Sequence, residues 1–149
     1  MLDKIFCVDD DPITLMLCKK VIERVEFAKE IITAQNGEEA IQYFHDLAQN
    51  QKQEASASYP KLIFLDLNMP KKDGREALKE IKNNSDLRGI PVVVLTTSKA
   101  EEDIYRTYHL GVNSFITKPV TFDSLVNIIK ELGRYWFEIV ELPLERKSL

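Results

Sequence analysis

The chain has 149 residues, of which 20 are basic and 24 acidic, so its net charge is −4. This length predicts one domain that can bury a hydrophobic core. The mildly acidic balance disfavours nucleic acid as a partner, because phosphate contacts need a concentrated basic face. No apolar run reaches the ~20 residues that span a bilayer, which disfavours a membrane protein. The two cysteines lie in apolar segments without metal-ligand spacing, which favours a reduced, cytoplasmic compartment.

The first part of the chain alternates apolar runs with segments of helical periodicity. Residues 4–8 predict a buried strand, and Asp11-Pro12 suits the N-cap and first position of a helix. The apolar residues of that helix are Ile13, Leu17, Val21 and Val25. Residues 30–34 predict a second strand, followed by a helix with the apolar stripe Ala40, Ile41, Phe44, Leu47 and Ala48. The polar residues 49–60 predict a surface loop.

The second part repeats the alternation three times. Residues 61–65 predict the third strand. In the helix that follows, Ala77, Leu78 and Ile81 are expected to face the core. Residues 92–95 predict the fourth strand, with a helix around 100–109. Residues 112–117 predict the fifth strand, and the last helix has the inward residues Leu125, Ile128, Ile129 and Leu132.

These segments form five successive strand–helix units. Strands that are apolar throughout indicate a parallel sheet covered on both faces, and right-handed crossovers give a doubly wound α/β domain. The expected architecture is a flavodoxin-like (βα)5 fold with sheet order 2-1-3-4-5. We assign residues 1–135 to this domain and 136–149 to an apolar C-terminal tail, too short for a second domain. Because this tail is so apolar, we expect it to fold back on the domain or to be buried in a second subunit.

Polar side chains occur at the carboxyl ends of the predicted strands, where open parallel sheets bind ligands. Asp9 and Asp10 follow the first strand, Asp66 the third, Thr96 the fourth and Lys118 the fifth. Strands 1 and 3 are neighbours in the expected order, ~4.8 Å apart, so three carboxylates would crowd together. One lysine cannot neutralise them, and an all-oxygen donor set suits Mg²⁺. A carboxylate beside Mg²⁺, a hydroxyl and an ammonium has the parts for phosphoryl transfer to the carboxylate itself.

Four motifs in this order resemble the response-regulator receiver family over roughly residues 3–135. They are Val8-Asp9-Asp10, Leu65-Asp66-Leu67-Asn68-Met69-Pro70 with Asp73-Gly74, Leu95-Thr96, and Thr117-Lys118-Pro119. The resemblance implies that Asp66 accepts the phosphoryl group and that Thr96 and Lys118 contact it. It also implies that Mg²⁺ is held by Asp9, Asp10, Asp66 and the backbone carbonyl of Asn68. In such domains the Lys118–Pro119 bond is expected to be cis.

Two positions depart from the family pattern. Phe115 stands where the family often has a tyrosine that rotates between outward and inward positions, so a switch at Phe115 would lack the hydroxyl hydrogen bond. Thr97 stands where a smaller residue often follows the switch threonine, and we expect it to affect access to Asp66.

The resemblance implies a stand-alone response regulator without an output domain. It would accept a phosphoryl group on Asp66 from a sensor histidine kinase or a phosphotransfer protein. It would then signal by protein contact through the fourth helix, fifth strand and fifth helix. We expect that the protein is not an enzyme acting on a diffusible metabolite, because a receiver domain catalyses only its own phosphorylation and dephosphorylation. The 49–60 loop, the 71–76 and 92–98 segments and the tail resemble single-domain regulators that partner phytochromes, which implies a phytochrome-type kinase and a tail-assisted homodimer.

Other functions fit the sequence less well. A haloacid-dehalogenase-type phosphatase needs a second aspartate two residues after the nucleophile, where Asn68 stands. A flavin carrier of the same fold needs a phosphate-cradling loop after the first strand, where carboxylates would repel the phosphate. A receiver-like domain that only binds partners is disfavoured, because every acidic and basic site position is filled.

Several other polar residues are expected to have structural or surface roles. Asp73 should be a turn or N-cap residue before the third helix, and Cys7 and Cys18 should be small core residues. His45 and His109 lie on predicted helices without metal-pair spacing, so we expect them at the surface.

Overall fold

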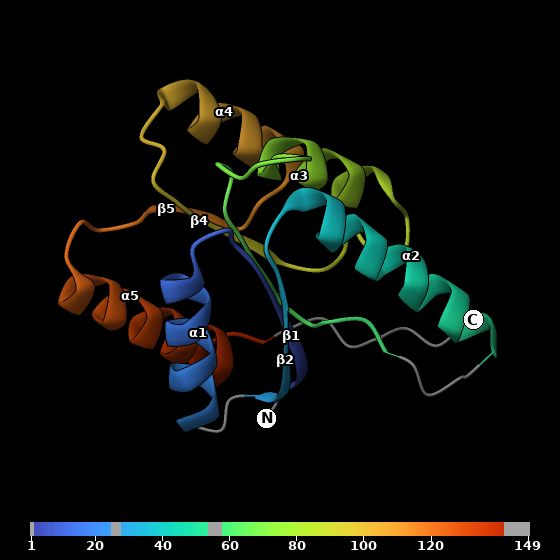
Figure 1. Ribbon diagram of the computed structural model, residues 1–149, viewed down its shortest axis with the longest axis horizontal. Coiled ribbons are helices and arrows are strands. Elements are labelled where there is room, and N and C mark those ends of the chain that lie inside the picture. The colour runs from blue at the N-terminus through green and yellow to red at the C-terminus, as the bar shows by residue number, and fades with distance from the viewer. Residues whose placement is uncertain (1, 25–27, 54–57, 142–149) are drawn as a thin grey trace.

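A computed structural model describes residues 2–24, 28–53 and 58–141 (Figure 1). Its centre is a five-stranded parallel sheet with the order β2-β1-β3-β4-β5, which confirms the predicted topology. The strands are β1 (Leu2–Val8), β2 (Ala28–Ala34), β3 (Ile63–Leu65), β4 (Val92–Thr96) and β5 (Ser114–Thr117). The order reverses between β1 and β3, so the loops that follow these two strands open a crevice at the carboxyl edge.

Helices cover both faces of the sheet, as predicted for strands that are apolar throughout (Figure 1). They are α1 (Pro12–Arg24), α2 (Gly37–Gln53), α3 (Gly74–Asn83), α4 (Glu101–Leu110) and α5 (Phe122–Arg134). Helices α1 and α5 pack together on one face, and α2, α3 and α4 lie in sequence on the other. In the described part of the chain, none of the helices combines the length and hydropathy needed to cross a membrane.

The two faces of the sheet form two hydrophobic clusters. Ile63, Leu65 and Val94 point into the cluster beneath α2 and α3. Phe64 and Val93, one position along their strands, point into the cluster beneath α1 and α5. Side chains of a strand alternate between faces, so the central strands β3 and β4 need an apolar residue at every position. All of their residues except the terminal Thr96 are apolar, and all are buried.

Aspartate caps begin two of the helices, as the sequence predicts. The Asp11 carboxylate accepts from the Ile13 N–H at 3.0 Å and from the Thr14 hydroxyl at 2.8 Å. The Asp73 carboxylate accepts from the backbone N–H groups of Arg75 and Glu76. Such caps satisfy N–H groups that have no partner within the helix.

The predicted 49–60 loop is wrong in its first part. Helix α2 continues to Gln53, and residues 54–57 lie outside the described residues. The absence of an apolar stripe suggested a loop, but the glutamines and lysine in this stretch are good helix formers, so a helix forms without such a stripe. The strand predicted at 61–65 begins at Ile63.

The chain continues as a helix across the boundary predicted at residue 135. A wide π-helical segment, η1 (Tyr135–Ile139), follows α5 directly. Trp136 is 7% exposed and packs in the cluster beneath α1 and α5, whereas Ile139 is 60% exposed. This part of the tail therefore folds back on the domain. Leu142 and Leu144, two further apolar residues of the predicted tail, lie outside the described residues.

Gly74 is required by the loop that follows β3. This loop returns so closely that a Cβ on Gly74 would lie 1.9 Å from the Asp66 carbonyl oxygen. We expect Gly74→Ala to displace the Asp66 loop and to lower the free energy of unfolding by about 1–3 kcal/mol, as overpacking does. Urea denaturation measures this. The control is Gly89→Ala, where a Cβ would meet nothing within 4 Å. Equal stability of both variants would contradict the prediction.

The burial of Trp136 gives a second stability prediction. Trp136→Ala removes a large side chain from the α1/α5 cluster, and we expect it to lower the free energy of unfolding by about 3–5 kcal/mol. Ile139→Ala, on the exposed side of the same segment, should change it by less than about 0.5 kcal/mol. Thermal and urea unfolding of the two variants decide this. If the tail leaves the domain in solution, the two variants should have similar free energies of unfolding, which would contradict the prediction.

Candidate functional site

The strand register brings the predicted acidic residues together. Val8 of β1 is paired with Leu65 of β3, and the Asp66 N–H donates to the Val8 carbonyl at 2.9 Å. The residues that follow these two strands, Asp9 and Asp66, are therefore neighbours. Carboxylate oxygens of Asp9, Asp10 and Asp66 all lie within 4.8 Å of one another. Asp9 and Asp66 are buried, while Asp10 is exposed at the mouth of the site.

Lys118 enters the same site from β5. Thr96 and Thr117 are paired in the β4–β5 ladder, and the Lys118 N–H donates to the Thr96 carbonyl at 2.6 Å. The ammonium lies 2.7 Å from Asp9 Oδ2 and 3.6 Å from Asp66 Oδ2. The Lys118 side chain is only 7% exposed. A cation shielded from water binds carboxylates more strongly than a surface lysine does.

Burial raises the pKa of Asp9 to about 7, although the Lys118 bond and the N–H of Asp11 act in the opposite direction. The pKa of Asp10 is also raised, by partial burial and by the neighbouring charge of Asp66. Burial acts to lower the pKa of Lys118, but its bond to Asp9 and the nearby carboxylates outweigh this and raise it. The lysine is therefore a permanent cation, and the carboxylates around it still carry excess negative charge.

The donor set fits a hard divalent cation. Three carboxylates offer oxygen ligands within a few ångströms, and a single ammonium bridges two of them. This leaves uncompensated negative charge in a partly dry crevice. Mg²⁺ and similar ions bind one or two carboxylates together with water and phosphate oxygens.

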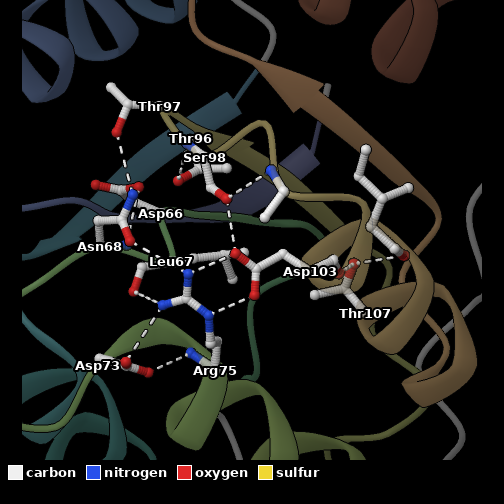
Figure 2. Close-up of polar contacts among 12 residues, drawn as sticks. Asp66, Leu67, Asn68, Asp73, Arg75, Thr96, Thr97, Ser98, Asp103 and Thr107 are labelled. Atoms are coloured by element: carbon white, nitrogen blue, oxygen red, sulfur yellow. Dashed lines mark hydrogen bonds and ion pairs between the residues drawn. The ribbon is translucent and has the colours of Figure 1, made fainter.

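Asn68 and Thr97 lie at the entrance to Asp66 (Figure 2). The Asn68 N–H donates to Asp66 Oδ1 at 3.3 Å, and the Asn68 side-chain amide donates to the Thr97 hydroxyl at 3.1 Å. Thr96 is fully buried, and its hydroxyl accepts a long bond, 3.4 Å, from the Ser98 N–H. Thr97 thus contacts the loop that carries Asp66, where the sequence predicted an effect on access.

A cleft of about 470 Å³ opens beside the carboxylates. Its polar wall includes Asp10, Asp66 and Lys118, and its apolar wall includes Val120 and Phe122 of the segment after β5. Val120 is 98% exposed. Asp66 therefore lies at an open cleft.

The expectation of a cis Lys118–Pro119 bond is wrong. All peptide bonds in the described residues are trans. The trans isomer is the more stable form of X–Pro bonds by about 0.5–1 kcal/mol. With this bond trans, the Lys118 ammonium still reaches Asp9.

The remaining predicted residues lie as follows. Phe115 is half-buried and packs against the cluster beneath α2 and α3, and its N–H donates to the Tyr108 hydroxyl at 3.2 Å. Cys7 and Cys18 are free and buried, as expected for core residues. A hydrogen bond with Cys18, together with burial, raises the pKa of Cys7 and keeps its thiol protonated. His45 and His109 are exposed, as predicted.

Sequence reasoning missed an ion pair beside the site. Arg75 of α3 binds Asp103 of α4 through two hydrogen bonds of 2.6 Å (Figure 2). The two residues are 28 positions apart on different predicted helices. No spacing in the sequence indicates this contact, because it depends on how α3 and α4 pack.

Comparisons with known proteins identify the family of this chain. A family model described as the response regulator receiver domain matches residues 5–130. Response regulator Rcp1 of Synechocystis sp. is 40% identical over 139 residues, which cover 93% of this chain and 92% of Rcp1. The probable methanogenesis regulatory protein FilR2 of Methanothrix harundinacea is 37% identical over 132 residues, which cover 89% of this chain and 82% of FilR2.

Solved structures are similar along almost the whole chain. The crystal structure of the Mn²⁺-bound form of Rcp1 has a TM-score of 0.83 at 39% identity and covers 95% of this chain and 99% of that chain. The phosphorylated cyanobacterial phytochrome response regulator RcpA has a TM-score of 0.83 at 41% identity, covering 97% of this chain and 100% of that chain. The family match and these relatives show that the chain belongs to the response regulator receiver domain family of two-component signalling.

Proposed function

We propose that this protein is a stand-alone response regulator that accepts a phosphoryl group on Asp66. The observation that carries the proposal is the position of Asp66, a buried carboxylate at a strand end with Lys118 Nζ 3.6 Å from its Oδ2. An Asp66 oxygen forms a bond to phosphorus while the bond from phosphorus to the donor's imidazole nitrogen breaks. The donor is the phosphohistidine of a sensor histidine kinase or of a phosphotransfer protein.

The neighbouring residues have separate roles in this proposal. Lys118 is placed to stabilise negative charge on the transferred phosphoryl oxygens, and the Thr96 hydroxyl is to bind the phosphoryl group once it is attached. Mg²⁺ would be held by Asp9, Asp10, Asp66 and the backbone carbonyl of Asn68. When bound, it supplies charge neutralisation between the carboxylates and the incoming phosphoryl group. The support is the crowded oxygen donor set and the Mn²⁺-bound form of the relative Rcp1.

The signal is proposed to pass from Thr96 and Phe115 to the surface of α4, β5 and α5, where it changes contacts with a partner protein. Phosphorylation would shift an equilibrium between two conformations that already exist. Catalysis in this proposal is limited to the protein's own phosphorylation and dephosphorylation.

The nature of the partners rests on the relatives. Rcp1 and RcpA are matched over 92% and 100% of their own lengths, which supports a receiver that acts without an attached output domain. RcpA is a phytochrome response regulator, which supports a phytochrome-type kinase as the phosphoryl donor. The homodimer through the C-terminal tail and the cytoplasmic location stay predictions, and light scattering with and without phosphorylation tests the dimer.

Intact-mass spectrometry after incubation with acetyl phosphate and Mg²⁺ tests the phosphoacceptor. We expect the wild-type chain to gain the mass of one phosphoryl group and Asp66→Asn to gain none. Asp73→Asn is the matched control, because Asp73 lies on the same loop but caps α3. It should still be phosphorylated. An unmodified wild-type chain, or an equal adduct on Asp66→Asn, would refute the proposal.

Metal affinity should depend on pH through Asp9. A carboxyl with a raised pKa of about 7 holds its proton below that pH, and the proton must leave before a cation binds. We expect the Mg²⁺ association constant to fall about tenfold for each pH unit below 7 and to level off above it. Calorimetric titration over this range measures it. Asp9→Asn should bind more weakly and lose most of the pH dependence, whereas a pH-independent wild type would contradict the assignment.

A further inference from the structure

The guanidinium of Arg75 joins helix α3 to helix α4. Its Nε donates to Asp103 Oδ1 and its Nη2 donates to Asp103 Oδ2, both at 2.6 Å (Figure 2). The Asp103 side chain is 14% exposed and that of Arg75 is 38% exposed. Two parallel bonds to one carboxylate fix both distance and orientation, which a single ion pair does not.

The same guanidinium also contacts the loop that carries Asp66. Arg75 Nη2 donates to the side-chain oxygen of Asn68 at 3.3 Å, and Nη1 lies 3.3 Å from the Asp73 carboxylate. The Asn68 amide in turn reaches the Thr97 hydroxyl. A continuous set of polar contacts therefore runs from the entrance of the Asp66 site through Arg75 to α4 (Figure 2).

Asp103 organises the beginning of α4 on the other side of this contact. Its Oδ2 accepts from the Ser98 hydroxyl at 2.6 Å, two residues after Thr96. Its backbone carbonyl accepts from the Thr107 hydroxyl at 2.7 Å. The bonds from Arg75 lower the pKa of Asp103 to about 2, so this carboxylate is ionised throughout the neutral range.

The first turn of helix α4 carries three acidic residues, whereas Leu110, in its last turn, packs partly buried against the cluster beneath α2 and α3. Thr107 is the one buried residue of α4, and Tyr105 and Tyr108 are exposed. The residue before the helix, Ala100, provides no side-chain cap. Helix α3, in contrast, buries Ala77, Leu78 and Ile81. The polar contacts of Asp103 therefore carry a large share of the attachment of the first turn of α4.

We propose that Arg75 is a positioning residue that latches the first turn of α4 to the Asp66 loop. The latch makes the position of α4 depend on Asn68 and Thr97, the two residues at the entrance to Asp66. Its use in signalling rests on the proposed function, because a phosphoryl group on Asp66 would have to displace this entrance. The latch itself exists in the unmodified protein and is testable there.

Hydrogen–deuterium exchange of the unmodified chain tests the latch. Loss of a bidentate, charge-assisted contact in Arg75→Gln should speed exchange of amides 100–110 about tenfold. Asp103→Asn should have a similar effect, and the double variant should match the single variants instead of adding their effects. Arg75→Lys keeps the positive charge but loses the planar guanidinium that makes two parallel bonds. Its exchange rate should lie between those of Arg75→Gln and the wild type.

The matched control is Arg106→Gln. It removes an arginine of α4 that pairs with Glu102 within the same helix, so the change of charge is the same but no contact with α3 is lost. Exchange at 100–110 should stay within about twofold of the wild type. Amides of α1 and α5 serve as internal references for an intact fold. Equal exchange in Arg75→Gln and Arg106→Gln, or additive effects in the double variant, would overturn the latch.

A second arm separates the latch from the proposed function. The chains are treated with acetyl phosphate and Mg²⁺, and exchange is compared at equal phosphorylated fractions measured by intact mass. We expect phosphorylation to change the exchange of α4 in the wild type and to change it less than half as much in Arg75→Gln. A wild type that takes no phosphoryl group refutes the proposed function and leaves the first arm valid. A phosphorylated wild type whose α4 is unchanged, or changes no more than in Arg75→Gln, refutes the signalling role.

Discussion

The contact of Lys118 with Asp9 and Asp66 is the interaction on which the rest of the structure depends. Two buried carboxylates on neighbouring strands repel each other, and the Lys118 ammonium between them reduces that repulsion. This arrangement needs β1, β3 and β5 to end at the same edge of the sheet, which the parallel order provides. The charge that Lys118 leaves unbalanced is what makes the crevice suitable for a divalent cation. Lys118 therefore both reduces the repulsion between the two carboxylates and helps to set the net charge of the site.

The loop after β3 shows how strictly the backbone around Asp66 is constrained. Lys71 has a φ of 57°, in the left-handed region that non-glycine residues seldom adopt. The next carbonyl, that of Lys72, accepts from the Gly37 N–H at 2.7 Å at the start of α2. A Cβ on Gly37 would lie 2.1 Å from that oxygen. Two glycines, Gly37 and Gly74, thus allow the loop to pack closely between α2 and the Asp66 backbone.

The two faces of the sheet differ in how they hold their helices. Helices α1 and α5 pack together over a continuous apolar cluster that also takes Trp136. On the opposite face, α2 and α3 bury apolar residues, whereas α4 is attached through Asp103, the Tyr108 hydroxyl and the partly buried Leu110. Polar contacts can exchange partners with less loss of packing than an apolar core allows. We therefore expect the first turn of α4 to respond to changes at Asp66 more readily than α2 or α3 does.

The sequence alone determined the fold class, the strand order and the residues of the candidate site. Those predictions rest on local signals, namely apolar strands, turn and cap residues, and a carboxylate or cation directly after a strand. The role of Asn68 and the assignment of Asp66 as phosphoacceptor rest on the resemblance to the receiver family. Asp9, Asp66 and Lys118 were predicted as neighbours because parallel strands place their carboxyl ends at one edge. The extension of α2 to Gln53 and the helical continuation through Trp136 were missed, because polar or mixed segments have weak local signals.

Only the tertiary structure decided the contacts between helices and the conformation of individual bonds. The pairing of Arg75 with Asp103 depends on the packing of α3 against α4, and the bond before Pro119 is trans although the resemblance implied cis. The raised pKa of Asp9 likewise follows from burial, which requires the complete fold. Local patterns in a sequence report the preferences of short segments, whereas these features arise from side chains that are distant in the chain and meet only when it has folded.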